Sequence, residues 1–346
     1  NSFALGGGEL GALTRAFDWS TTALGPMSAW PQSLRTSVST MLRSPYPITL
    51  FWGRELVMLY NDPFRPIHGD KHPATLGAPA PRALAEAWHV LGPLVQKTLD
   101  TGEPLYVENG LVMFARQPGG LKEESYFTWS YNPTIGEDGQ IAGLFAIASE
   151  TTRQVIGDRR LGTLRDLSLR TAYDRSVGAV FRSVEEVLTT ASSDVAFALL
   201  YVVESDEARL VSCTGLERGA AAAPMSWKPG EACPWPLEGV SRSGQEEVLV
   251  EGLDAMDGPL PGGPWPEPAT RALVLSVPMG ADAHTTGVLV AGLSPRRSVD
   301  DEYRSFLQLL ARQISASISS ARAYEQEALR AQKLAELDRA KTDFFS

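Results

Sequence analysis

The sequence predicts an α+β protein with two domains, each an antiparallel β-sheet flanked by helices, linked and followed by long helices. Three observations predict this fold class. The 346 residues exceed the usual length of a single domain. Strand-like segments fall into two groups, separated by a stretch with helical periodicity. Tight-turn signals join neighbouring strands within each group, which favours antiparallel pairing.

The first group of strands follows a helical N-terminal segment. Apolar residues recur at helical spacing over 9–17 and 30–43. Five segments are then expected to be strands: 48–52, 56–60, 105–114, 125–133 and 140–148. A helix is expected over 81–99, and the EDG run at 137–139 is a hairpin-turn signal between the last two strands.

The second group follows a helical stretch over 150–172 and a further helix over 177–191. Its expected strands are 195–203, 208–214, 247–250, 271–279 and 286–293. Residues 219–268 are rich in Gly, Pro and Trp and are expected to be largely loop. Long loops in compact domains are often functional.

The C-terminal segment, 299–346, is expected to be one helix with an N-cap and acidic first turn in 298–302. At about 1.5 Å per residue it would span roughly 70 Å, too long for one small domain to bury. We therefore expect it to pair with its own copy in a homodimer. The expected seam is Leu307, Leu310, Ile314, Ser317, Ala321, Tyr324, Ala328 and Ala331, shifting phase at Leu334, Leu337, Lys341 and Phe344.

Composition excludes several classes of function. A net charge of -10 without a Lys/Arg cluster argues against nucleic-acid binding. No apolar stretch is long enough to predict a membrane span in this chain. Two cysteines give no disulfide framework, so a cytoplasmic location is expected. Phosphate-loop and nucleophile-elbow motifs are absent, and neither a catalytic residue nor a metal site is predicted.

The first block resembles a PAS domain. The similarity lies in the hairpin ITLFWGRELVMLYND, the helical middle and the late strand pair ESYFTWSYNPTIGEDGQIAGLFAIASETT. That run closes on Glu150-Thr151-Thr152, which is similar to the acidic-x-Thr element that couples a PAS domain to the next helix, although many members carry Asp where Glu150 stands. The segments DWSTTALGPMSAWPQSLR and LYNDPFRPIHGDKHPATLG also resemble the opening of PAS domains in bacterial PAS–GAF histidine kinases.

The second block resembles a GAF domain in its strands DVAFALLYVVES, ALVLSVPMG and TGVLVAGLSP. The last residues, LAELDRAKTDFFS, resemble the start of the dimerisation and phosphoacceptor domain of histidine kinases. The resulting organisation is an N-terminal helical cap (1–45), a PAS domain (46–150), a linker helix (151–175), a GAF domain (176–298) and an exit helix (299–346).

Aromatic residues are the candidates for a sensory pocket. Phe127, Trp129 and Tyr131 alternate along one strand and are expected to share a face. The candidate pocket residues are Trp52, Tyr60, Trp88, His89, Phe127 and Trp129 in the PAS block, and Trp227 and Cys233 in the GAF block. Core packing or a dimer interface is the alternative role for these aromatics.

Histidine and cysteine chemistry receives little support from the sequence. The resemblances imply two cofactor options: haem at His89, as in some haem-binding PAS domains, and a bilin at Cys233, as in bilin-binding GAF domains. Those GAF domains typically carry the Cys in a Cys-His context, whereas here Pro234 follows Cys233 and His284 is distant in sequence, so no cofactor is expected. His68 and His72 are expected to be polar surface residues, and Cys213 a small core residue.

Together these features predict the input region of a two-component sensor histidine kinase. It would sense an unidentified small molecule or other signal in either domain and control autophosphorylation of a downstream His through a dimeric helix. Its further partners would be the kinase ATP-binding domain and a response regulator. Two alternatives stay open: a PAS–GAF receptor with another output, such as a phosphatase or cyclic-dinucleotide enzyme, and a ligand-free dimerisation scaffold.

Overall fold

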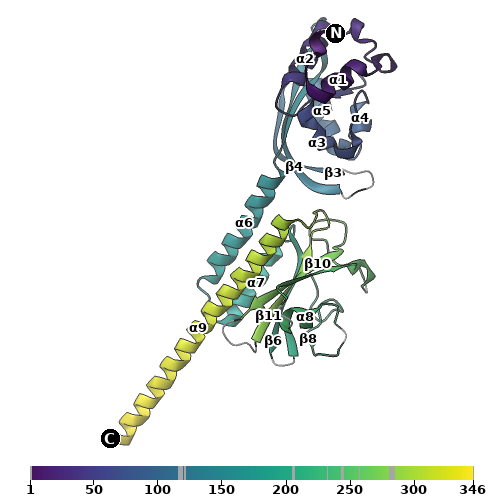
Figure 1. Ribbon diagram of the computed structural model, residues 1–346. Helices are drawn as coiled ribbons and strands as arrows, with labels where there is room; N and C mark the ends of the chain where they lie inside the picture. Colours follow the sequence, from purple (N-terminus) through teal and green to yellow (C-terminus); the bar gives the residue numbers. More distant parts are fainter. Residues whose placement is uncertain are drawn as a thin grey trace. The chain divides into compact units, whose positions relative to one another are not determined.

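The computed structural model describes residues 2–115, 120, 122–204, 207–231, 233–242, 245–256, 258–279 and 285–345. The chain divides into two compact units, Asn1–Ile156 (unit 1) and Gly157–Ser346 (unit 2) (Figure 1). Each unit contains one antiparallel sheet with helices against it, so the predicted α+β class is confirmed. Within the described residues, every helix is too short or too polar to cross a bilayer.

The N-terminal helices of unit 1 share its hydrophobic core. They are α1 (Gly8–Ala16) and α2 (Gln32–Arg43), and the intervening Trp19 and Trp30 are buried in the same core as the sheet. The Asp62 carboxylate accepts hydrogen bonds from the first backbone N–H groups of α1, at 3.0 Å from Glu9 and 2.8 Å from Leu10. The N-terminal segment is thus fixed to the body of unit 1.

The sheet of unit 1 has five strands in the order β2-β1-β5-β4-β3, all pairs antiparallel. The strands are β1 (Ile48–Trp52), β2 (Val57–Tyr60), β3 (Leu105–Ala115), β4 (Lys122–Ile135) and β5 (Ile141–Glu150). Helix α2 contacts β1 and β2, whereas α5 contacts β3, β4 and β5. The predicted turn before β5 is confirmed, with Gly139 at a φ of 76° that favours glycine.

The segment between β2 and β3 holds three helices, α3 (Arg65–His68), α4 (Ala80–Ala83) and α5 (Trp88–Thr101). The predicted single helix over 81–99 is therefore wrong. The backbone of Leu84 leaves the helical region, with φ -117° and ψ 31°, and ends α4. Apolar spacing alone could not show this break, because Leu84 and Leu91 are both buried as they would be in one helix.

Unit 2 contains a six-stranded antiparallel sheet in the order β8-β7-β6-β11-β10-β9. The strands are β6 (Val195–Glu204), β7 (Glu207–Thr214), β8 (Ser226–Trp227), β9 (Glu247–Glu251), β10 (Arg271–Pro278) and β11 (Thr285–Leu293). Helices α6 (Thr152–Thr171), α7 (Val177–Thr190) and α9 (Asp301–Phe345) supply one core cluster with the sheet (Figure 1). A second cluster joins the sheet to α8 (Leu237–Arg242) and nearby loops. Helix α8 and strand β8 lie in the region predicted to be largely loop.

Helix α9 is the predicted C-terminal helix, and its N-cap lies within the predicted stretch 298–302. Asp300 caps the first turn, because its Oδ1 accepts from the Tyr303 N–H at 2.8 Å. The first half of the predicted dimer seam is wrong, because those residues are buried against the sheet of unit 2. The buried seam residues are Leu307, Leu310, Ile314, Ser317 and Ala321.

Candidate functional site

Unit 1 contains an apolar cavity of about 50 Å³ between its sheet and the helices that precede β3. Thr49 and Phe51 of β1 contribute from one face of the sheet, and Leu50, between them in the chain, points to the other face. The full lining is Thr49, Phe51, Phe64, Ile67, Leu84, Leu91, Val112, Phe114, Phe127, Trp129, Tyr131, Ala146 and Ala148. An apolar hollow lined by aromatic side chains is the kind of place where small molecules bind.

Three predicted aromatics of β4 line this cavity together. Phe127, Trp129 and Tyr131 are each at most 5% exposed, and their shared face is confirmed. Phe127 lies edge-on to Phe114, with ring centroids 5.4 Å apart. Aromatic walls held by such contacts keep the cavity's shape fixed.

The other four candidates in unit 1 lie away from the cavity lining. Trp52 is buried on the opposite face of β1. Tyr60 directs its hydroxyl to His72 Nδ1 at 2.9 Å and receives a hydrogen bond from Thr75. Trp88 is half-buried at the start of α5, and the neighbouring His89 is exposed.

His68 is buried, contrary to the prediction that it is a polar surface residue. Its side chain is 1% exposed and its ring packs 4.6 Å from that of Tyr60 and 5.2 Å from that of Phe64. Burial, reinforced by the charges of Lys71 and His72, lowers the pKa of His68 to about 3. The imidazole is therefore neutral at physiological pH.

The end of unit 1 contains the predicted acidic-x-Thr element. Thr152 Oγ1 accepts from the backbone N–H of Tyr126 at 2.9 Å and donates to Glu150 Oε1 at 2.9 Å. The Thr151 N–H donates to the Tyr126 carbonyl at 2.8 Å. These bonds tie the first residue of α6 to β4, the strand that supplies three aromatics to the cavity. A shift of β4 would therefore reach α6 directly.

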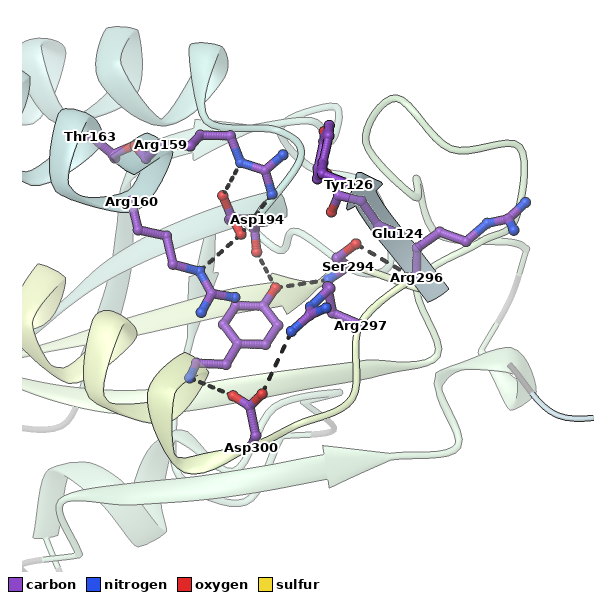
Figure 2. A network of polar contacts seen from close by, with 11 residues as sticks. Glu124, Tyr126, Arg159, Arg160, Thr163, Asp194, Ser294, Arg296, Arg297 and Asp300 are labelled. Carbon is purple, nitrogen blue, oxygen red and sulfur yellow. Dashed lines mark hydrogen bonds and ion pairs between the residues drawn. The ribbon is translucent and has the colours of Figure 1, made fainter. Parts of the chain in front are cut away.

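Unit 2 holds α6 through a buried carboxylate, Asp194, just before β6 (Figure 2). Asp194 is 1% exposed and pairs with both guanidinium groups of Arg159 and Arg160, at 2.6 and 3.0 Å. Its backbone carbonyl accepts from the Tyr303 hydroxyl, and the Arg160 guanidinium lies 4.3 Å from the Tyr303 ring centroid. One residue thus joins α6, β6 and α9.

Sequence reasoning missed this polar network. The sequence signal was the adjacent pair Arg159-Arg160 in a predicted helix. Arginines in a helix are expected to face solvent, so this pair did not predict a buried network. Their partner Asp194 lies more than thirty positions along the chain, as the 35- and 34-residue separations show. Nothing local in the sequence links these positions.

The candidate residues of unit 2 are packed into its second core cluster. Trp227 is 7% exposed and donates its Nε1–H to the Glu231 carbonyl at 2.9 Å. Cys233 is half-buried, and burial raises the pKa of its thiol. Cys213 is buried, as predicted. His284 lies outside the described residues.

A surface groove of about 530 Å³ lies between α7 and β7, and neither Trp227 nor Cys233 lines it. Arg218 and Glu185 on its walls form an ion pair at 2.5 Å. Within the described ranges, no three His, Cys, Asp or Glu side chains gather as a metal-binding group.

Residues 174–319 match the GAF domain family, so the chain contains a GAF sensory domain in unit 2. The match starts just before α7 and ends within α9. No curated protein matches the chain.

Solved structures similar to the chain include several GAF proteins. The GAF domain of an Acinetobacter phosphoenolpyruvate-protein phosphotransferase is 19% identical, with 48% of this chain and 97% of that chain covered and a TM-score of 0.35. The GAF domain of a phosphoenolpyruvate-protein phosphotransferase from Coxiella burnetii is 19% identical, with 49% of this chain and 97% of that chain covered and a TM-score of 0.36. Free methionine-R-sulfoxide reductase from Neisseria meningitidis, in complex with its substrate, is 20% identical, with 47% of this chain and 90% of that chain covered and a TM-score of 0.31. Similarities this distant assign no ligand or activity to this chain.

Proposed function

We propose that this chain is the sensory and signal-transmitting region of a two-component sensor histidine kinase, with a PAS domain in unit 1 and the GAF domain in unit 2. The observation that carries the proposal is the course of α9. The GAF match ends at residue 319, but α9 continues to Phe345, and residues 323–339 are exposed. A helix that leaves a sensory domain in this way can transmit its state to a following domain.

Two features of unit 1 support a PAS domain. Its element order is two strands, several short helices and three further strands, in one antiparallel sheet. The Glu150-Thr151-Thr152 element bonds to β4 and begins the next helix, as the resemblance implies. A ligand in the cavity would act on β4 and, through Thr152, on α6.

Support for a kinase output comes from the sequence at the end of α9. The run LAELDRAKTDFFS resembles the start of the dimerisation and phosphoacceptor domain. In the proposed system, α9 pairs with its copy in a homodimer and positions a downstream phosphoacceptor His for the ATP-binding domain. The phosphoryl group then passes to a response regulator. A ligand's influence is limited to its differential affinity for the two signalling states.

A chimera tests the proposal. Residues 1–346 are fused in register to the phosphoacceptor and ATP-binding domains of a characterised histidine kinase, and autophosphorylation from labelled ATP is measured. We expect an active kinase whose rate changes about fivefold or more in Thr152→Val, because this variant removes the hydroxyl that bonds β4.

Thr163→Val is the matched control, because among the described residues the Thr163 hydroxyl donates to the Arg159 carbonyl within α6, at 3.2 Å, and to no other partner. This variant should leave the rate nearly unchanged. An inactive chimera, or equal effects of both variants, would count against the proposal. A chimera that works only with a phosphatase or cyclic-dinucleotide output would favour the alternative receptor.

A further inference from the structure

The cavity of unit 1 carries one buried hydrogen-bond donor without a protein partner. Trp129 lines the cavity and is 5% exposed, and its indole Nε1 has no hydrogen-bond partner among the described residues. The neighbouring Tyr131 hydroxyl approaches this indole closely enough for a weak hydrogen bond, which opposes the rise that burial causes in the pKa of Tyr131, but the contact falls short of a well-formed hydrogen bond. A buried N–H left unsatisfied is costly, so such a group in a cavity wall marks a place for an acceptor.

The remaining polar capacity of the cavity wall is already used. Thr49 Oγ1 donates to the Leu59 carbonyl at 2.9 Å. The other lining side chains, apart from Trp129 and Tyr131, are hydrocarbon, and none of the described residues that line the cavity is charged. An ionised ligand would lose its hydration without a counter-charge, which excludes carboxylates, phosphates and amines in their charged forms.

The volume limits the size of the occupant. About 50 Å³ is space for roughly three to five water-sized groups, since one water needs about 10–15 Å³ of such a cavity. Water alone would be a poor occupant, because a water needs two to four polar partners and the wall offers at most two. A short hydrocarbon skeleton with one acceptor fits both the volume and the chemistry.

We propose that the cavity binds a small uncharged organic molecule with a single acceptor, of the class of short-chain ketones and aldehydes, whose oxygen accepts from Trp129 Nε1. The inference rests on the proposed function in taking this cavity as the sensory site. The aromatic walls contact the hydrocarbon part, and Tyr131 lies beside the acceptor. Ligand contact with Trp129 would act on β4, the strand bonded to Thr152.

Nuclear magnetic resonance of the full chain with ¹⁵N-labelled indoles provides the test. The Trp129 signal among the eight Trp indoles is assigned by its loss in Trp129→Phe. We expect 2-butanone to shift that signal saturably. The isosteric alkene 2-methyl-1-butene has no strong acceptor and should occupy the cavity without the same downfield shift.

Variants separate the donor from the cavity. Trp129→Phe should weaken 2-butanone binding about tenfold, as expected for one lost hydrogen bond, and leave binding of the alkene nearly unchanged. Trp52→Phe is the matched control, because Trp52 is equally buried but lies on the other face of β1. Ala146→Val and Ala148→Val fill the cavity and should abolish binding of both probes.

Three outcomes would overturn the inference. They are no saturable shift with the ketone, equal losses of ketone and alkene binding in Trp129→Phe, and a long-lived internal water as the only partner of the indole. The chimera assay is independent of these readouts. Ketone binding without an effect on phosphorylation would reject the proposed output while keeping the site, and a responsive kinase without ketone binding would reject only the ligand class.

Discussion

His68 illustrates how one buried side chain makes a unit sensitive to pH. In the folded state its ring is enclosed by Tyr60 and Phe64, and its Nε2 has no hydrogen-bond partner among the described residues. Its pKa is lowered to about 3, chiefly by burial, from the usual 6.5. Between these values the unfolded chain binds a proton that the folded chain does not, so acid favours unfolding.

Acidification should therefore destabilise unit 1 more than its carboxylates alone would. Above pH 6.5 we expect His68 to cause no loss of unfolding free energy. Between pH 6.5 and pH 3 the unfolding free energy should fall because of His68 by up to about 1.4 kcal/mol per pH unit. Urea unfolding at a series of pH values measures this slope. His68→Phe should remove this part of it.

His89→Gln is the control for the pH series, since His89 is exposed on α5. It should retain the wild-type slope between pH 6.5 and pH 4.5. If His68→Phe and wild type lost stability in parallel as the pH fell, then His68 would not be the group responsible.

At the scale of elements, Asp194 determines how firmly α6 is held by unit 2. Removing it would leave the Arg160 guanidinium, 8% exposed, as a buried charge without its carboxylate. Loss of one member of a buried ion pair typically costs about 3–5 kcal/mol. Each 1.4 kcal/mol changes the equilibrium constant for opening about tenfold. In Asp194→Ala we therefore expect the hydrogen-exchange protection of amides in β6 and α9 to fall about a hundredfold or more.

Asp166→Ala, on α6, is the matched control. Asp166 also pairs with an arginine, Arg165, at 3.1 Å, but the two side chains are 54% and 71% exposed. Exposed pairs contribute little, so protection should change by less than about fivefold. Similar losses in the two variants would mean that burial of Asp194 is not the source of its effect.

Turn chemistry explains which elements the sequence predicts well. The hairpins β1–β2 and β4–β5 follow from short Gly-containing turns between apolar runs, and Gly53 and Gly139 do adopt positive φ values of 72° and 76°. Helix α8 and strand β8 were missed because both are short and lie among glycines and prolines, where tertiary packing overrides local preference.

The cavity was only partly predictable for a related reason. Strand alternation places Phe127 and Trp129 on one face without knowledge of the fold. The same reasoning cannot tell which face of β1 borders the cavity, so Trp52 was included although it lies on the other side. Nor can it supply the opposite wall, where Phe64 and Leu84 come from short helices whose positions depend on the whole of unit 1.

At the scale of the whole molecule, α9 presents two distinct faces. One face, including Leu307, Leu310 and Ile314, belongs to the core of unit 2. The other runs along the helix at alternating spacings of three and four, through residues that are exposed or half-buried. These are Leu309, Gln313, Ala316, Ser320, Ala323, Glu327, Arg330, Leu334 and Leu337. We call this second face the exposed seam.

The exposed seam accounts for the phase shift noted in the sequence. Leu334 and Leu337 continue the register of Leu309 and Ala316, not that of the buried face. Its centre contains Ser320, Glu327 and Arg330, which are poor core residues. The proposed homodimer should therefore be held mainly by the leucines at the seam's ends and be weak enough to change state.

Disrupting the leucines of the exposed seam should dissociate that homodimer. We expect the full chain to sediment as a dimer at micromolar concentration, because Leu334 and Leu337 are both 67% exposed in a single chain and can pair with their copies. The double variant Leu334→Glu, Leu337→Glu should sediment as a monomer, because carboxylates of the two copies would then face each other across the seam. Leu329→Glu is the matched control, since Leu329 lies on α9 at 52% exposed but off the seam, so this variant should remain dimeric. A monomeric wild-type chain, or a double variant that remains dimeric, would mean that α9 does not pair through this face, and transmission to a kinase would then need another contact between the copies.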